Sequence, residues 1–224
     1  DLIALLVREA PPEDAELRSA AAGADWSVPR AAAALACGEG ELDRVARRLP
    51  PDTLTTHLDG VGCAVISDPA GPGRPAQLAR AAGATAAVLG PIGAPASLRG
   101  SWALARAGLQ AVESGAIDAT GLIRAEDRLA ELLLHEARDL VERIAARRLA
   151  PLCELTPKAR RRMEETALAF VQHQGNAAAM ARSMRLHPQT ARYRRARLRE
   201  LLGEQLDDPD SRFELELALR ARSA

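Results

Sequence analysis

The sequence has 224 residues, of which 47% are hydrophobic, and this is enough for one large domain or two smaller ones with apolar cores. Only 2% of the residues are aromatic, so the cores must be built mainly from alanine, leucine and valine. The formal net charge is zero, no signal peptide opens the chain, and no apolar run approaches the ~20 residues of a membrane-spanning helix. These features argue against a membrane partner.

The three cysteines exclude two other classes of protein. Cys37, Cys63 and Cys153 are odd in number, far apart and without a CxxC pair, so neither a disulfide framework nor a zinc site is indicated. We expect small core residues in a reducing cytoplasm, with no metal and no cofactor. The sequence begins at Asp1 rather than Met, and we therefore expect it to be part of a longer protein.

Charge is unevenly distributed along the chain. Residues 1 to 120 carry 10 basic and 14 acidic side chains, whereas residues 151 to 202 carry 11 basic and 4 acidic. Basic side chains supply the sequence-independent, salt-sensitive part of DNA affinity by contacting phosphates. The pattern favours a regulator that binds DNA through one local module.

The first half of the chain alternates between strand-like and helix-like segments, which is typical of an α/β domain. The apolar run 2–7 predicts a buried strand, and the acidic segment after Pro11 and Pro12 predicts a helix to about residue 22. Segment 27–37 fits a strand or a helix, and we assign it as a strand. Further strands are predicted at 61–67 and 84–89, and further helices at 41–49, 75–82 and 97–113. Residues 1–115 are predicted to form this α/β domain.

From Ala125 onward the signals are helical only, which predicts a helical connector over 116–160 and an all-α domain over 161–224. Thr156 and Pro157 open a helix that should extend to about residue 174. Other helices are predicted at 126–135, 137–149 and 211–219. The side chains expected to face the core of the last domain are Met163, Ala167, Phe170, Val171, Phe213, Leu217 and Ala218. The predicted fold class is thus α+β/α.

The segment 175–203 predicts two short helices joined by a tight turn. Asn176 is a good N-cap for an alanine-rich helix that ends near Met184. Residues 185–187 are too few for anything but a turn, and Pro188 suits the first turn of a second helix that continues to residue 202. The spacing of apolar residues fits a helix-turn-helix. Its predicted core consists of Met180, Ala181, Met184, Leu186, Ala191 and Leu198.

The second helix has the charge pattern of a helix that enters the major groove of DNA. It carries five arginines and one acid, Glu200. Gln189 can pair with adenine, and Arg192 or Arg194 with guanine, each at about 1–3 kcal/mol of discrimination. The alternative is a solvated arginine-rich helix. The predicted DNA-binding residues are His187, Gln189, Thr190, Arg192, Tyr193, Arg194 and Arg197.

Two of these residues admit a second interpretation. His187 could contact a phosphate or cap the second helix, and capping is favoured. Tyr193 could contact a phosphate or stack in the domain core, and both stay open. No catalytic residues are predicted, because His135-Glu136 with Asp139 lacks the second histidine of HExxH and residues 71–74 lack the Gly-Lys-Ser/Thr of a P-loop.

The C-terminal segment resembles the DNA-binding domain of the PucR family of transcriptional regulators, the purine-catabolism and sugar-diacid type. The matching pieces are GNAAAMARSM, LHPQTARYR, LRELLG and DDPDSRFELELALR, within about residues 164–220. The α/β part is similar to the degenerate GGDEF-like domain that precedes this module in such regulators. Two residues depart from the usual pattern: Arg195 replaces an apolar residue, so its stem is buried or the helix is rotated, and Arg185 stands where many such turns have glycine.

This resemblance implies a bacterial regulator that binds operator DNA as a homodimer and responds to a small-molecule effector. It also implies no cyclase activity, because the chain lacks a Gly-Gly-Asp/Glu-Glu-Phe motif and Asp59-Gly60 alone cannot hold the metal ions that a cyclase needs. The rival interpretation is a nucleotide- or metabolite-sensing module whose helix-turn-helix serves protein interaction.

Overall fold

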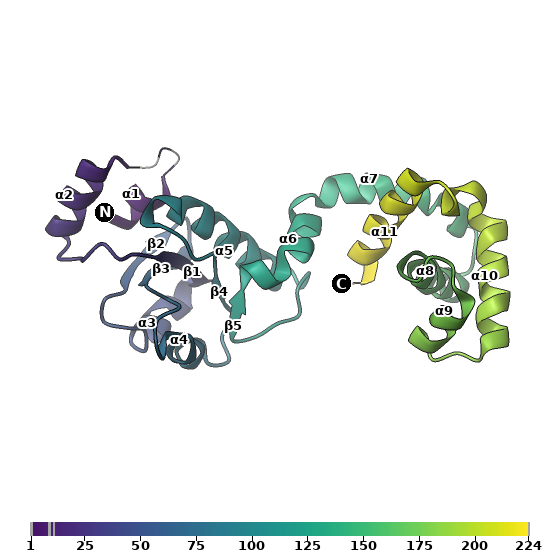
Figure 1. Cartoon of the computed structure of the whole chain (residues 1–224), viewed down its shortest axis with the longest axis horizontal. Coiled ribbons are helices and arrows are strands. Elements are labelled where there is room, and N and C mark those ends of the chain that lie inside the picture. The colour runs from purple at the N-terminus through teal and green to yellow at the C-terminus, as the bar shows by residue number, and fades with distance from the viewer. Residues whose placement is uncertain (1, 9, 11, 224) are drawn as a thin grey trace. The chain divides into compact units, whose positions relative to one another are not determined.

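The computed structural model describes residues 2–8, 10 and 12–223 and divides into two compact units (Figure 1). The first is Asp1–Leu133 and the second is Leu134–Ala224, and helix α6 (Leu129–Glu136) spans the boundary. Among the residues described, no helix combines the length and the apolar character that a membrane crossing requires. Each unit has its own core, which is one of the two arrangements that the length and composition allow.

The first unit is built on a five-stranded mixed sheet in the order β2-β3-β1-β4-β5. Strand β1 pairs antiparallel with β3 on one side and with β4 on the other, β2 pairs antiparallel with β3, and β5 pairs parallel with β4. The strands are β1 Ala32–Gly38, β2 Leu54–Leu58, β3 Val61–Ser67, β4 Ala87–Leu89 and β5 Leu122–Arg124.

Helices cover both faces of this sheet (Figure 1). On one face, Ala34 and Ala36 of β1 pack in a core with α1, α2 and α5, and on the other, Ala33 and Leu35 pack with α3 and α4. Both faces of β1 are therefore buried, which explains its continuous apolar sequence. The helices are α1 Leu2–Val7, α2 Asp14–Gly23, α3 Leu42–Ala46, α4 Arg74–Ala82 and α5 Leu98–Glu113.

The strand prediction for 2–7 is wrong, because these residues form α1. Leu2, Ile3 and Leu6 are buried while Ala4 is exposed, so burial follows the helical period rather than alternation. An apolar run this short fits either structure, and packing on α5 decides. Two strands were also missed. β2 contains the polar residues Thr55, Thr56 and His57 at an edge of the sheet, and β5 has only three residues.

The hairpin between β2 and β3 turns at Asp59 and Gly60, whose φ angles are 51° and 76°. Left-handed backbone at both central residues suits the twist of a two-residue hairpin, which is why Asp-Gly is favoured there. At the other edge, β5 pairs with β4 and so adds residues beyond 115 to the first unit. The segment 116–160, predicted as a helical connector, thus includes a strand.

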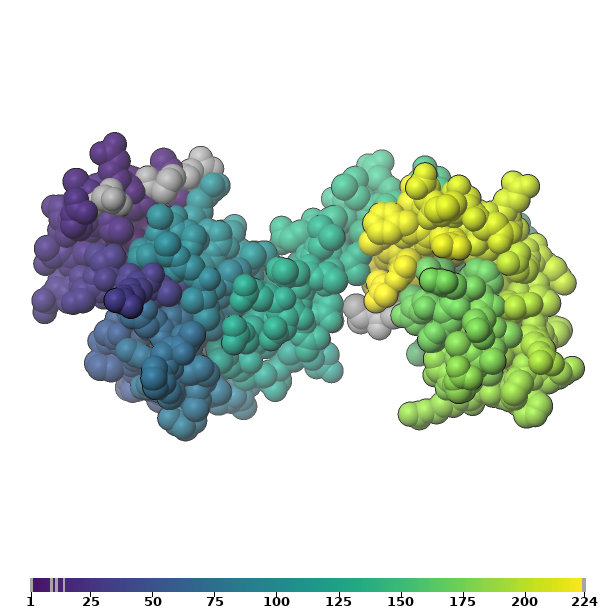
Figure 2. Space-filling view, viewed as in Figure 1, coloured from purple at the N-terminus to yellow at the C-terminus, as the bar shows by residue number. Residues whose placement is uncertain are grey.

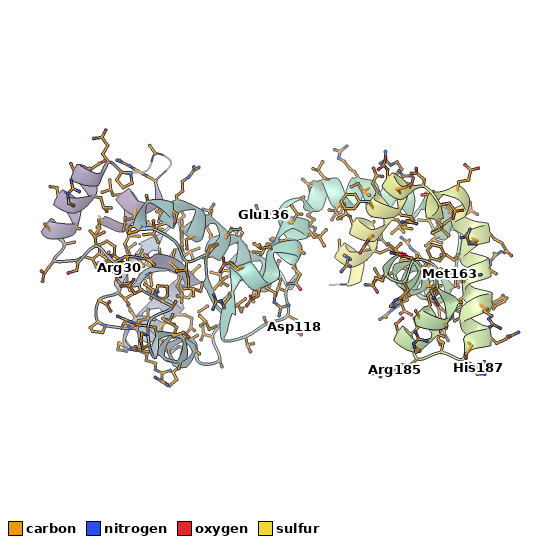
Figure 3. All side chains as sticks on the ribbon, in the orientation of Figure 1. Arg30, Asp118, Glu136, Met163, Arg185 and His187 are labelled. Carbon is orange, nitrogen blue, oxygen red and sulfur yellow. The ribbon has the colours of Figure 1, made fainter. Side chains whose placement is uncertain are left out.

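The second unit is all-helical. Its core contains Leu149, Leu152, Met163, Phe170 and Leu215, and Figure 3 shows Met163 in the interior of the unit. Helix α11 is also held to α7 by Glu214, which accepts hydrogen bonds from Arg148 at 2.7 Å and from Arg147. These two guanidinium groups lower the pKa of Glu214. The helices are α7 Arg138–Arg148, α8 Pro157–Gln172, α9 Ala177–Ser183, α10 Pro188–Leu202 and α11 Pro209–Ser223.

Two predictions of burial are wrong in this unit. Phe213 is 64% exposed, because α11 turns Leu215 and Leu219 inward instead, together with Ala218, which is buried as predicted. Cys153 is exposed, since it follows the short turn Ala150–Leu152, in which Leu152 fills the core. In the first unit, Cys37 and Cys63 are buried as predicted, and burial raises their pKa values to about 11 and about 12.

Candidate nucleic-acid interface

The turn before α9 sets where the helix-turn-helix begins. Gln174 and Gly175 adopt left-handed backbone with φ angles of 49° and 72°, and the Gly175 N–H donates to the Phe170 carbonyl at 2.8 Å. This bond satisfies a carbonyl at the end of α8. Asn176 then caps α9, because its Oδ1 accepts from the N–H groups of Ala178 and Ala179 at 3.1 Å each.

The turn between α9 and α10 is closed in a similar way. Arg185 has a φ of 53°, and the Leu186 N–H donates to the Ala181 carbonyl at 2.9 Å. His187 then caps α10, with its Nδ1 accepting from the Gln189 N–H at 3.3 Å, and Pro188 follows in the first turn. Figure 3 places Arg185 and His187 at the tip of the second unit, between the two helices.

Arg185 adopts a backbone conformation that glycine would adopt at lower cost. Left-handed backbone costs roughly 1–2 kcal/mol for an L-residue other than glycine. Glycine avoids this cost, but its greater conformational entropy in the unfolded chain offsets part of the gain in stability. We expect Arg185→Gly to raise the free energy of unfolding by up to about 1 kcal/mol in urea titrations. Arg182→Gly, one turn earlier within α9, is the control and should lower it by about 1 kcal/mol. Destabilisation by Arg185→Gly would contradict this account of the turn.

Small and apolar residues bring α9 and α10 together. Met180, Ala181, Ala191 and Leu198 are buried, and all but Ala181 are fully so. The other two residues of the predicted core, Met184 and Leu186, are partly buried. The burial of Ala191, Leu198 and Leu202 fixes which side of α10 faces inward.

The opposite side of α10 is open to solvent. Tyr193 is 71% exposed, so its side chain does not stack in the core. Arg194 lies at the flank and is partly buried. The exposed members of the predicted DNA-binding set are His187, Gln189, Thr190, Arg192, Tyr193 and Arg197.

Two arginines of α10 make contacts with other parts of their own unit. Arg195 is partly buried, and its Nη1 donates to the Gly175 carbonyl at 3.0 Å, so the residue that departs from the family pattern ties α10 to the turn before α9. The guanidinium of Arg199 lies 5.6 Å from the centre of the Phe170 ring and also pairs with Asp207 at 3.1 Å. Both contacts hold α10 against the helices behind it.

The remaining arginines leave a positive surface on the helix-turn-helix. Arg197 pairs with Glu200 at 2.7 Å, and Glu200 is the only acid between residues 175 and 203. The four arginines of this segment other than Arg195, Arg197 and Arg199 form no ion pair with any residue that the structure describes. We call them the unpaired arginines, and they are Arg182, Arg185, Arg192 and Arg194.

The prediction from sequence did not include Arg182 and Arg185, because it considered only the second helix. The sequence does show that both lack an acidic partner, since neither has an acid within four positions.

No cluster of three or more His, Cys, Asp or Glu side chains that could hold a metal occurs in residues 2–8, 10 and 12–223. The geometry is that of a capped helix pair with an unpaired basic edge.

A comparison with known protein families matches this helix pair to one of them. Residues 163–221 match the family model of the PucR C-terminal helix-turn-helix domain. They form a PucR-type helix-turn-helix. The match covers α8, except its first turns, through most of α11, and a domain of this type suggests a transcriptional regulator.

Comparisons with curated proteins and with solved structures do not identify a family. A search of curated proteins finds no match. Among solved structures, the chain is similar to the crystal structure of a regulator of polyketide synthase expression from Bifidobacterium adolescentis. The identity is 16%, the coverage is 99% of this chain and 91% of the other, and the TM-score is 0.48, which is too low to establish a shared fold.

Proposed function

We propose that the protein is a cytoplasmic transcriptional regulator that binds operator DNA by inserting α10 into the major groove. The observation that carries this proposal is the outward side of α10, where exposed polar side chains lie beside arginines that no acid neutralises. Residues near the start of such a helix reach base edges, and basic residues around it contact phosphates. Gln189 suits adenine, and Arg192 and Arg194 suit guanine or phosphate.

Two further roles belong to the same proposal. The protein binds as a homodimer, because one short helix reads only a few base pairs and paired half-sites supply specificity. The first unit is a degenerate GGDEF-like domain that relays the signal of a small-molecule effector. The order of its elements supports this assignment: a strand, a helix, a β-hairpin, a helix and two more strands joined by α5.

Fluorescence anisotropy with DNA from upstream of the protein's own gene tests the proposal. Affinity should fall steeply between about 50 and 200 mM salt, because each neutralised phosphate releases counterions. Arg192→Ala with Arg194→Ala should weaken binding at least about tenfold and reduce the salt slope by about 1 to 2. Both residues lie on the surface proposed to enter the groove.

The matched control removes two arginines from α7, which lies outside the proposed interface. Arg138→Ala with Arg143→Ala makes the same change in net charge and should alter affinity less than about threefold. Equal losses of DNA affinity in both double variants would mean that the protein binds DNA only through non-specific attraction between charges. Unchanged binding after removal of Arg192 and Arg194 would reject α10 as the reading helix.

A further inference from the structure

Helix α11 exposes an aromatic side chain in a protein that has few. Of the two phenylalanines, Phe170 is buried in the core of the second unit, whereas Phe213 is 64% exposed. Leu217 follows Phe213 by four residues on the same side of α11 and is only partly buried. Large exposed apolar residues that adjoin one another mark interaction surfaces more often than isolated ones do.

Charged residues extend this apolar pair into a stripe along the helix. Asp210 precedes Phe213 by three residues, and Arg220 follows Leu217 by three, so the four positions have the spacing of a coiled-coil seam. We call these four residues the α11 seam. Asp210 and Arg220 are both exposed. Arg220 forms an ion pair with Glu216 of its own helix at 2.6 Å, and half of the Arg220 side chain stays exposed.

The seam points away from the core of its own unit. The opposite side of α11 carries Ser211, Leu215, Ala218 and Leu219, all of them buried. Glu214, between the two sides, pairs with α7. In Figure 2, α11 is coloured yellow and forms part of the surface of the second unit.

We propose that the α11 seam docks on the α11 seam of a second copy of this chain, with the two helices antiparallel. A twofold axis midway between Phe213 and Leu217 places Phe213 of one copy against Leu217 of the other. The same axis places Asp210 of each copy against Arg220 of the other. A parallel arrangement would bring like charges together at both ends, so charge selects the antiparallel one.

The contact between two α11 seams is small, so we expect it to be weak. A single pair of helices buries less than a standard protein interface, so the free dimer is weak. Its place in operator binding rests on the proposed function: two linked helix-turn-helix domains bind paired half-sites more tightly than either alone. Self-association through the seam, however, is measurable without DNA.

Sedimentation velocity with the full chain and no DNA tests the seam by exchanging its charges. Asp210→Arg and Arg220→Asp should each raise the dimer dissociation constant at least about tenfold, because each places like charges opposite each other twice. An equimolar mixture of the two variants should regain dimers. In the mixed pair, every arginine of the seam again faces an aspartate.

The apolar contact of the seam is tested by removing Phe213, and removal of Tyr193, the exposed aromatic residue of α10, is the matched control. Phe213→Ala should weaken self-association at least about tenfold, because a buried aromatic anchor is lost. Tyr193→Ala, on α10, should leave self-association unchanged while it weakens DNA binding. Circular dichroism melts of all variants should match the wild type within a few degrees, which separates docking from folding.

Three results would overturn the seam. They are a wild-type chain that stays monomeric in sedimentation velocity without DNA, single charge variants that dimerise as well as the wild type, and a mixture that fails to regain dimers. The last result is also expected if another part of the same chain covers the seam. Loss of DNA binding in Arg192→Ala with Arg194→Ala, with dimers intact, concerns the proposed function alone.

Discussion

Gly175→Ala should lower the free energy of unfolding of the second unit by about 2–4 kcal/mol. Two costs combine at this position. With φ at +72°, an alanine pays roughly 1–2 kcal/mol for left-handed backbone. Its Cβ would also lie 2.9 Å from Cε2 of Phe170, a ring that is packed in the core, and such overpacking costs typically 1–3 kcal/mol.

The measurement is urea unfolding, with hydrogen exchange to locate the loss in α8 to α10. Gly115→Ala in the first unit is the control, because Gly115 has a similar φ of +76° but no atom within 4 Å of an added Cβ. It should lose only the backbone part, about 1–2 kcal/mol. Equal losses in the two variants would mean that the Phe170 ring can move aside.

The same substitution should also weaken DNA binding. The Gly175 carbonyl accepts the hydrogen bond from Arg195, and the Phe170 ring lies under Arg199. A shift of this turn therefore moves both contacts that hold α10 in place. The anchoring of α10 thus depends on the preceding turn as much as on its own apolar side.

Elements whose signals are local were the ones that the sequence predicted well. Helix α10 has the predicted bounds because Pro188 suits its first turn and Gly203 follows its last residue. Asn176 caps α9 through bonds to residues two and three positions away. Strand β3 also has the predicted bounds, since its apolar, β-branched sequence lies between two turns.

Elements that depend on distant partners were predicted poorly. Strand β2 is stable only as a neighbour of β3, and β5 only as a neighbour of β4, so their own sequences carry little signal. The exposure of Phe213 depends on how α11 meets α7. Long-range packing of this kind leaves no periodicity that a single segment would reveal.

For the candidate site, the sequence predicted the outward residues of α10 but not the division of labour among its arginines. Arg195 stands out in the sequence because it replaces an apolar residue, but its bond to the Gly175 carbonyl could not be predicted. Arg199 looks like the other arginines in the sequence, and only the three-dimensional structure shows its contact with Phe170. That Arg192 and Arg194 contact DNA stays a prediction.

Leu198→Ala should lower the free energy of unfolding of the second unit by about 2–5 kcal/mol, the range for a fully buried leucine whose cavity stays open. Leu198 has no exposed surface, and it packs in the same core as Met180 and Phe170. Its loss removes the central contact on the inward side of α10. Urea unfolding measures the effect, and the two tryptophans, Trp26 and Trp102, report the first unit separately.

Leu201→Ala provides the comparison, because Leu201 lies on the same helix and is only partly buried. The substitution removes the same atoms but should cost less than about 1.5 kcal/mol, since the Leu201 side chain buries less apolar surface than that of Leu198 and its removal leaves no enclosed cavity. The difference between the two variants measures how firmly α10 is oriented. If the order were reversed, the inward side of α10 would have to be rotated toward Leu201, and Tyr193 would no longer lie at the centre of the exposed side.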